Sequence, residues 1–224
     1  MSRKSAPVSF GSIKPKPPLV MPGQRVGLLG GSFNPPHDAH RLITGTARRR
    51  LGLDAVWWVV TPGNPLKSHG ELAPLGERLA LCEKMTPNPA IKITAFEEDL
   101  PSAYTAATLA FLKRRFPNVR FVWLMGADNL ATFHLWQDWQ SIADQMPIAV
   151  VDRPGWRLPS MAQKTAHYLR RSYVPEQRAR VLPMLQAPAW TFLTGRLSRL
   201  SSTEIRENRK TFLATLAKRA LMED

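Results

Sequence analysis

The sequence predicts an α/β fold with a doubly wound, mostly parallel sheet, and two patterns support this prediction. First, six apolar runs of strand length recur along the chain, at residues 25–30, 55–60, 91–96, 119–125, 147–152 and 189–194. Continuous apolar runs are typical of strands buried on both faces of a parallel sheet. Second, amphipathic stretches separate the runs, at residues 38–51, 75–86, 104–116 and 127–145. Strands that alternate with helices favour a parallel sheet with right-handed crossovers.

The end of the chain is predicted to be helical. Residues 202–222 have the pattern of one or two C-terminal helices, which open with the stretch SSTEIRENR. The segment before them, 153–199, is rich in arginine and has Glu176 as its one acidic residue.

The length and composition indicate one substantial domain preceded by a tail. The chain has 224 residues, of which 44% are hydrophobic, and this is enough to build a buried core. Residues 1–22 contain basic residues, many prolines and serines, and no acidic residue. Such a composition cannot bury a core, so we expect a flexible basic tail over 1–22 and a domain over 23–224.

The cysteine content and the hydropathy indicate a cellular compartment. The single cysteine, Cys82, excludes an intrachain disulfide and fits a reducing compartment. No run approaches the roughly 20 apolar residues of a membrane span. The N-terminus lacks the apolar core of a secretion signal. We therefore expect a cytoplasmic protein that does not bind membranes.

The charge balance favours anionic partners. The chain has 31 Lys and Arg residues against 17 Asp and Glu residues, which gives a formal net charge of +14. Nucleotides, nucleic acids and acidic membrane surfaces all carry the complementary charge, so the net charge alone does not choose between them.

The first predicted strand leads into the stretch LGGSFNPPHDAH, residues 29–40. Parallel sheets bind ligands outside the carboxyl ends of their strands, and the first strand–helix loop is a favoured place. Gly30 and Gly31 remove side chains where another group can approach the backbone closely. The two prolines stiffen the loop, so that Asp38 is the first suitable start for a helix.

Two histidines flank the predicted start of this helix. His40 falls in the first turn, near unpaired N–H groups and the positive end of the helix dipole. Together with His37, this arrangement predicts a site for phosphate oxygens. The pair could instead ligate a metal, although no Cys or carboxylate cluster at ligand spacing accompanies it, or it could be ordinary capping residues. The sequence has no G-x-G-x-x-G after the first strand and no P-loop motif.

The stretch GGSFNPPHDAH resembles the signature G-x-F-N-P-x-H-x-G-H of the nicotinate/nicotinamide mononucleotide adenylyltransferases, a family with a Rossmann-like nucleotidyltransferase fold. Ala39 stands where the family has glycine between the histidines. The stretch RLSSTEIRENR, residues 199–209, resembles the second signature I-S-S-T-x-I-R. The stretch TPGNPLK, residues 61–67, resembles the family's loop with a substrate-facing lysine.

Three more stretches extend the resemblance over residues 25–209. EEDLPSAYTAATLAFL resembles the acidic stretch followed by S-Y-T-x-x-T-L, with Ala103 where serine is common. WLMGADNLATFHLWQDW is similar to the family's G-A-D-x-L…W segment, and VDRPGW also matches. The motif set as a whole resembles the bacterial, nicotinate-preferring type.

The resemblance implies an enzyme that transfers the adenylyl group of ATP to nicotinate mononucleotide, giving nicotinate adenine dinucleotide and pyrophosphate in NAD biosynthesis. The implied catalytic residues are His40, His37 and Arg206. The implied ATP-binding residues are Gly30, Gly31, Ser32, Phe33, His37, His40, Gly126, Asp128, Arg153, Ser201, Ser202, Thr203 and Arg206. The implied mononucleotide-binding residues are Ser32, Phe33, Asn34, Lys67, Tyr104, Thr105 and Trp136. Mg²⁺ is expected as a cofactor held mainly by the triphosphate, with no metal site of the protein's own.

Each of these motifs also has a purely structural interpretation. Ser201 and Glu204 form the pattern of a capping box at a surface helix. Tyr104 can open a plain N-capped helix, Trp136 can belong to the core, and Lys67 can be solvated.

Other functions fit parts of the sequence. The acceptor can be nicotinamide mononucleotide, or phosphopantetheine or glycerol phosphate as in other nucleotidyltransferases with the H-x-x-H motif. From a different class, a basic nucleic-acid-binding protein fits the pI of about 10.7. The sequence has no recognisable base-reading motif, so we expect no specific nucleic-acid partner.

Overall fold

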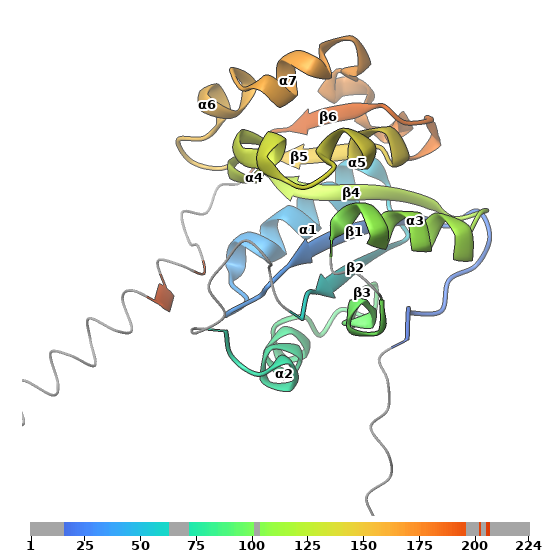
Figure 1. Ribbon diagram of the computed structural model, residues 1–224, viewed down its shortest axis with the longest axis vertical. Coiled ribbons are helices and arrows are strands. Elements are labelled where there is room, and N and C mark those ends of the chain that lie inside the picture. Colours follow the sequence, from blue (N-terminus) through green and yellow to red (C-terminus); the bar gives the residue numbers. More distant parts are fainter. Residues whose placement is uncertain (1–15, 63–71, 101–103, 196–201, 203–204, 207–224) are drawn as a thin grey trace, which may run out of the picture.

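The structure is a computed structural model that describes residues 16–62, 72–100, 104–195, 202 and 205–206. Six parallel strands form one sheet in the order β3-β2-β1-β4-β5-β6 (Figure 1). The strands are β1 (Arg25–Gly31), β2 (Ala55–Val60), β3 (Ile91–Thr94), β4 (Arg120–Gly126), β5 (Ile148–Val151) and β6 (Trp190–Leu193). The predicted α/β fold with a doubly wound parallel sheet is therefore confirmed.

Helices connect the strands and follow the predicted amphipathic stretches. The α-helices are α1 (Asp38–Leu51), α2 (Leu75–Met85), α3 (Thr105–Arg115), α4 (Ala127–Thr132), α5 (Trp139–Gln145), α6 (Arg157–Met161) and α7 (Lys164–Tyr168). Short 3-10 helices are η2 (Phe96–Asp99), η3 (Phe133–Leu135), η4 (Arg170–Ser172) and η5 (Glu176–Met184). The first helix begins at Asp38, as the two prolines before it predict.

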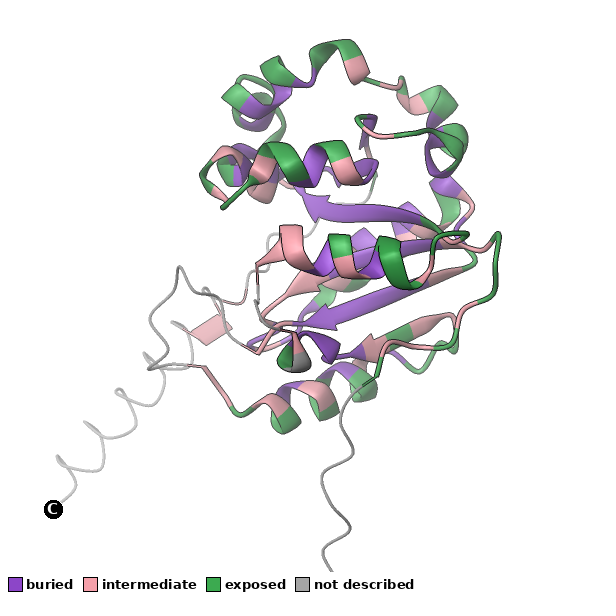
Figure 2. Cartoon of the chain, turned by 45° about the vertical axis from the view of Figure 1, so that its right-hand side comes forward, coloured by how far each residue is buried: buried purple, intermediate pink, exposed green. Residues whose placement is uncertain are grey.

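Two hydrophobic layers cover the two faces of the sheet. Successive strand residues alternate between them, so that Trp57 packs in the layer with α3, α4, α5 and α7, and Trp58 packs in the layer with α1, α2 and η5. In Figure 1, α3 and α5 lie in front of the sheet and α1 lies behind it. Figure 2 shows the strands buried between helices whose outer surfaces are exposed. This burial on both faces explains the continuous apolar runs in the sequence.

Two predicted elements differ in their extent. The predicted strand over 91–96 ends at Thr94, because the chain turns into η2. The predicted helix over 127–145 is divided into α4, η3 and α5. The division falls where Trp136 is extended and Asp138 is left-handed with φ 52°, a conformation that Asp tolerates better than most residues.

The ends of the chain are described only in part. Of the predicted C-terminal helices, Ser202, Ile205 and Arg206 are described and are helical. Of the predicted tail, residues 16–22 are described, and Val20 packs against one hydrophobic layer. Residues 1–15 and 207–224 lie outside the described residues. No helix within the described part of the chain is long and apolar enough to cross a membrane.

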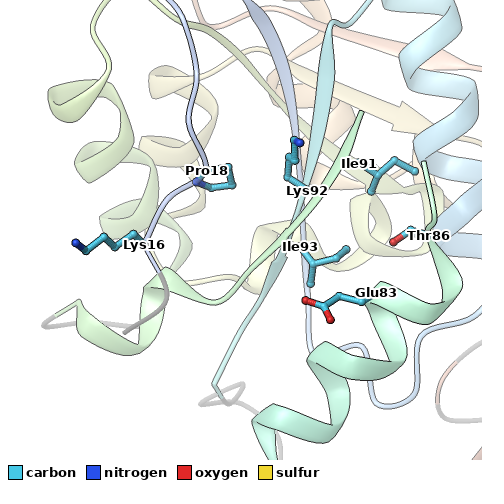
Figure 3. Close-up of a pocket in the computed structure, with 7 residues that line it drawn as sticks. All are labelled: Lys16, Pro18, Glu83, Thr86, Ile91, Lys92 and Ile93. Carbon is cyan, nitrogen blue, oxygen red and sulfur yellow. The ribbon is translucent and has the colours of Figure 1, made fainter. Parts of the chain in front are cut away.

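A cavity of about 320 Å³ lies at the β3 edge of the sheet (Figure 3). Its lining comes from the start of the described chain, the end of α2 and β3 itself, namely Lys16, Pro18, Glu83, Thr86, Ile91, Lys92 and Ile93. None of these is a predicted site residue, so the cavity is separate from the site considered next.

Candidate active site

The loop between β1 and α1 holds the two predicted histidines against each other. His37 is the N-cap residue of α1. Its main-chain N–H donates to Nδ1 of His40 over 3.2 Å, and the main-chain N–H of His40 donates to the carbonyl oxygen of His37 over 2.9 Å. The ring centroids are 3.8 Å apart. The helix start therefore fixes the position of both imidazoles.

Both imidazoles are neutral at pH 7 in the free protein. Burial lowers the pKa of His37 to about 4, and the nearby charge of Arg153 acts in the same direction. Burial also holds the pKa of His40 well below its usual value, with His37 and Arg153 adding to the effect. Because Nδ1 of His40 accepts a hydrogen bond, its neutral ring carries the proton on Nε2. His40 is thus a hydrogen-bond donor rather than a cation.

Aromatic rings pack against the histidine pair. The ring of Phe33 stacks on Trp58 with centroids 4.9 Å apart, and it lies 4.6 Å from the ring of His40. Phe33 has φ 45°, a left-handed conformation that a bulky residue adopts only when its surroundings impose it. The indole N–H of Trp58 donates to the hydroxyl of Thr44 in α1 over 2.7 Å. The loop is therefore anchored to both β2 and α1.

The C-terminal segment reaches the same loop. The hydroxyl of Ser202 donates to the carbonyl oxygen of Pro35 over 2.9 Å, and Nη1 of Arg206 donates to the carbonyl oxygen of Asn34 over 2.6 Å. The two predicted signatures meet in space through these described residues. Ser201, Thr203 and Lys67 lie outside the described residues.

Residues that follow β4 and β5 form a second group on this side of the sheet. Nη1 of Arg153 lies 2.6 Å from Oδ2 of Asp128 in a half-buried ion pair. At Gly126, a Cβ would overlap the Asp128 carboxylate, so only glycine fits here without a shift. A Cβ on Gly126 would also lie 3.5 Å from Cδ1 of Ile43, so this group borders the helix that the histidine pair begins. The other oxygen of Asp128, Oδ1, is buried without a hydrogen-bond partner in the described structure.

The two glycines at the end of β1 have different surroundings. A Cβ on Gly30 would overlap the indole ring of Trp123, so this glycine makes room for a core side chain. A Cβ on Gly31 would meet the ring of Phe33 at 3.4 Å, which is ordinary contact. The ring of Trp136 meets Trp123 edge-on at 6.5 Å and is half-buried. Trp136 thus belongs to the border of the hydrophobic layer on that face.

Tyr104 and Thr105 lie at the start of α3, which packs on the opposite face of the sheet from α1. The carbonyl oxygen of Tyr104 accepts the main-chain N–H of Thr108 over 3.2 Å, and the Thr108 hydroxyl donates to Oε1 of Glu97 over 2.6 Å. Glu97 is buried, and this burial raises its pKa to about 7 although the hydroxyls of Thr108 and Thr61 lower it. The start of α3 is therefore linked to the end of β2.

Two buried charged residues in this region are not among the sequence predictions. They are Glu97 and Arg78. Arg78 stands in the apolar stripe of α2, between Leu75 and Cys82 at helical spacing. A charged residue in such a stripe is the signal that could have drawn attention to it.

The sheet order and the position of these groups define the class of protein. The histidine loop follows β1 and the Asp128 group follows β4, and the strand order reverses between these two strands. Open parallel sheets bind nucleotides at this switch point. The molecule therefore has the architecture of a Rossmann-like nucleotide-binding enzyme. More narrowly, the chain belongs to the cytidylyltransferase-like family, whose model matches residues 28–208.

Known relatives narrow the comparison further. The chain is 57% identical over 181 residues to a probable nicotinate-nucleotide adenylyltransferase of Rhizobium meliloti (strain 1021), covering 81% of this chain and 96% of the relative. It is 53% identical over 182 residues to the probable nicotinate-nucleotide adenylyltransferase of Brucella abortus (strain 2308), covering 81% and 94%. The fold matches a solved Plasmodium falciparum nicotinic acid mononucleotide adenylyltransferase complexed with NaAD, with TM-score 0.63, 17% identity and coverage of 82% and 83%.

Proposed function

We propose that the protein is a nicotinate-nucleotide adenylyltransferase, which joins the adenylyl group of ATP to nicotinate mononucleotide. The meeting of Ser202 and Arg206 with the loop that precedes His37 is the observation that carries this proposal. It brings described residues of both family signatures into contact. The names of relatives more than 50% identical support the same activity.

The reaction is a displacement at phosphorus. A phosphate oxygen of the mononucleotide attacks the α-phosphorus of ATP, the bond from that phosphorus to the β-bridging oxygen breaks, and pyrophosphate leaves with the electron pair. The attacking oxygen is already ionised at pH 7, so no protein nucleophile or general base is needed. The barrier is to align two polyanions and to stabilise charge on the α-phosphate oxygens.

The neutral histidine pair fits this demand. The Nε2–H of His40 donates to an α-phosphate oxygen, and His37 holds the ring of His40 in place and contributes its own ring. A neutral donor at a helix N-terminus stabilises charge that develops on oxygen. Positive charge comes from Arg153 and Arg206, of which Arg206, together with Ser201, Ser202 and Thr203, would hold the β- and γ-phosphates.

The remaining predicted residues would bind the adenosine of ATP and the mononucleotide. The backbone of Gly30, Gly31 and Gly126 and the side chain of Asp128 would face the adenosine, since they lie at the carboxyl ends of β1 and β4. The mononucleotide would lie over Ser32, Phe33 and Asn34, with Lys67 near its phosphate. Trp136 and the amides at Tyr104 and Thr105 would receive the ring and its carboxylate.

Magnesium belongs to the proposal as the cofactor that accompanies ATP. We propose that phosphate oxygens provide most of its ligands. Bound to ATP, the ion would neutralise charge on the triphosphate.

Two further expectations stay with the proposal. The single cysteine, Cys82, is buried and free, which fits a reducing compartment, and we propose that the reaction takes place in the cytoplasm. We also retain the proposed division into a basic tail over 1–22 and a nucleotidyltransferase domain over 23–224.

The test is to incubate the purified protein with ATP, Mg²⁺ and one acceptor at a time, and to measure pyrophosphate. Nicotinate mononucleotide is expected to give the highest kcat/KM, nicotinamide mononucleotide a lower value and phosphopantetheine none. Pyrophosphate release with phosphopantetheine alone would assign a different nucleotidyltransferase. Salt-sensitive DNA binding without ATP turnover would favour the nucleic-acid-binding class instead.

A further inference from the structure

Arg78 occupies a place in α2 where a helix normally packs an apolar side chain. It is 1% exposed, and it and Cys82 are the two buried residues of α2. Leu75, Leu79 and Met85 flank them as partly buried residues. The helix therefore faces the domain with a guanidinium group at the centre of its apolar stripe.

The guanidinium group of Arg78 donates hydrogen bonds to main-chain carbonyl groups. Its Nε donates to the carbonyl oxygen of Ala73 over 2.9 Å. Its Nη1 donates to the carbonyl oxygens of Ser32 over 2.7 Å and Thr61 over 2.8 Å. Its Nη2 donates to the carbonyl oxygen of Pro62 over 3.2 Å. One side chain thus joins the exit of β1, the exit of β2 and the entry to α2.

The charge of Arg78 is solvated by these carbonyl groups but is not cancelled by them. Every hydrogen bond described for its guanidinium group is to a neutral carbonyl oxygen. Burial lowers the pKa of Arg78, yet a guanidinium group stays protonated at pH 7. Burying a cation costs several kcal/mol, and the four neutral carbonyl oxygens carry no full negative charge that would offset this cost. The position therefore calls for a role beyond packing.

Thr61, one of the residues that Arg78 binds, forms two further hydrogen bonds. The main-chain N–H of Thr61 donates to the carbonyl oxygen of Gly31 over 3.0 Å. The hydroxyl of Thr61 forms a hydrogen bond with the buried Glu97. The carbonyl oxygen of Thr61 binds Arg78. Thr61 is thus held by three hydrogen bonds, and these bonds fix the distance between the ends of β1 and β2.

We propose that Arg78 is a positioning residue for the mononucleotide half of the site. This inference rests on the proposed function, which puts the acceptor phosphate over the β1 and β2 exits. Arg78 fixes the spacing of Ser32 and Thr61 beneath that phosphate and leaves an uncancelled positive charge behind it. The adenosine half also includes Gly126 and Asp128 at the end of β4, and none of the hydrogen bonds described for Arg78 reaches them.

Two substitutions distinguish the effect of the loop spacing from the effect of the positive charge of Arg78. Arg78→Lys keeps the charge but loses the planar fork that reaches several carbonyl oxygens, and Arg78→Gln loses both. Lys84→Gln, on the exposed side of the same helix, is the matched control for removal of one positive charge. Steady-state kinetics would be measured with each substrate varied in turn, and the melting temperature of each variant would be recorded.

The expected result is a split between the two KM values. The KM for nicotinate mononucleotide rises roughly 10–100-fold in Arg78→Gln and less in Arg78→Lys, because a small misplacement of a binding loop has effects of this size. The KM for ATP and all parameters of Lys84→Gln stay near the wild-type values. Equal rises in both KM values, or a lower melting temperature with an unchanged mononucleotide KM, would overturn the proposal in favour of a purely structural role.

A measurement on the wild-type protein covers the case in which neither variant folds. Amide hydrogen exchange at Ser32 and Thr61 is expected to slow on addition of nicotinate mononucleotide alone and to change little on addition of ATP alone. The opposite pattern would reject the role of Arg78. A failure of the proposed function would give a different result, because the wild-type protein would then release no pyrophosphate with ATP and nicotinate mononucleotide.

Discussion

The guanidinium group of Arg206 donates a hydrogen bond of 2.6 Å to the carbonyl oxygen of Asn34, a residue 172 positions earlier in the chain. The side chain of Asn34 in turn accepts the main-chain N–H of Ala73 over 3.3 Å, at the entry to α2. Asn34 therefore connects the C-terminal segment to the histidine loop and to the segment that Arg78 holds. The proposed triphosphate site depends on this long-range contact.

Removal of the Arg206 side chain tests that dependence. We expect Arg206→Gln to raise the KM for ATP roughly 10–100-fold, because a hydrogen bond to a charged group contributes about 1.5–3 kcal/mol. Steady-state kinetics with ATP varied would measure the change. Arg114→Gln, an exposed arginine in the last turn of α3, is the control. An ATP KM that is equal in the two variants would show that Arg206 does not contact the triphosphate.

Substitution of His40 tests the proposed chemistry. We expect His40→Ala to lower kcat by about 10²–10³, the usual effect of losing one preorganised donor to a transition-state oxyanion, with little change in the KM for nicotinate mononucleotide. The exposed His167→Ala should retain the wild-type rate. A His40→Ala enzyme with near-normal turnover would remove His40 from the mechanism.

The stability of the protein is expected to depend on pH through Glu97. Its pKa of about 7 in the folded protein lies above the ordinary value of 4.5, so between these pH values the folded state binds more protons than the unfolded state. Its contribution to stability is therefore present below pH 4.5 and is lost as the pH rises to about 7. A shift of this size corresponds to roughly 3 kcal/mol.

Glu97→Gln removes this titration while keeping an acceptor oxygen for Thr108. We expect the variant to be more stable than the wild type at pH 8 and equally stable near pH 4, as measured by urea denaturation across this range. Glu98→Gln, its exposed neighbour, is the control. A gain in stability that is the same at every pH would contradict the titration of Glu97 and point to a packing effect.

The packing of Trp123 against Gly30 predicts that alanine substitutions at Gly30 and Gly76 have different effects on stability. Gly30→Ala places a methyl group against the indole ring, so we expect a loss of about 1–3 kcal/mol of unfolding free energy. Gly76→Ala, in the first turn of α2 with nothing near its Cβ position, is expected to be neutral or stabilising by up to about 1 kcal/mol. Urea denaturation of both variants checks the pair, and equal free energies would refute the predicted overlap.

Local patterns in the amino-acid sequence predict most of the strands and helices and the motifs of the site. Apolar runs such as 55–60 predict buried strands because both faces of a parallel sheet are covered, and β2 has those same bounds. The prolines before Asp38 place the start of α1 because their rings exclude a helix. These features are local, and local chemistry is what a linear pattern records. The break of the predicted helix over 127–145 was missed because Trp136 packs against Trp123 of β4, a contact between segments that the local pattern does not record.

The charge state of the site and its long-range hydrogen bonds depend on how the folded chain brings distant residues together. The neutrality of His37 and His40 follows from burial and from Arg153, which the sheet brings to the histidines from beyond β5. The bonds of Arg78 to Ser32 and Thr61 exist because adjacent parallel strands end at the same edge of the sheet. Desolvation and contacts between distant segments depend on which residues the folded chain brings together, and no local pattern in the sequence specifies them.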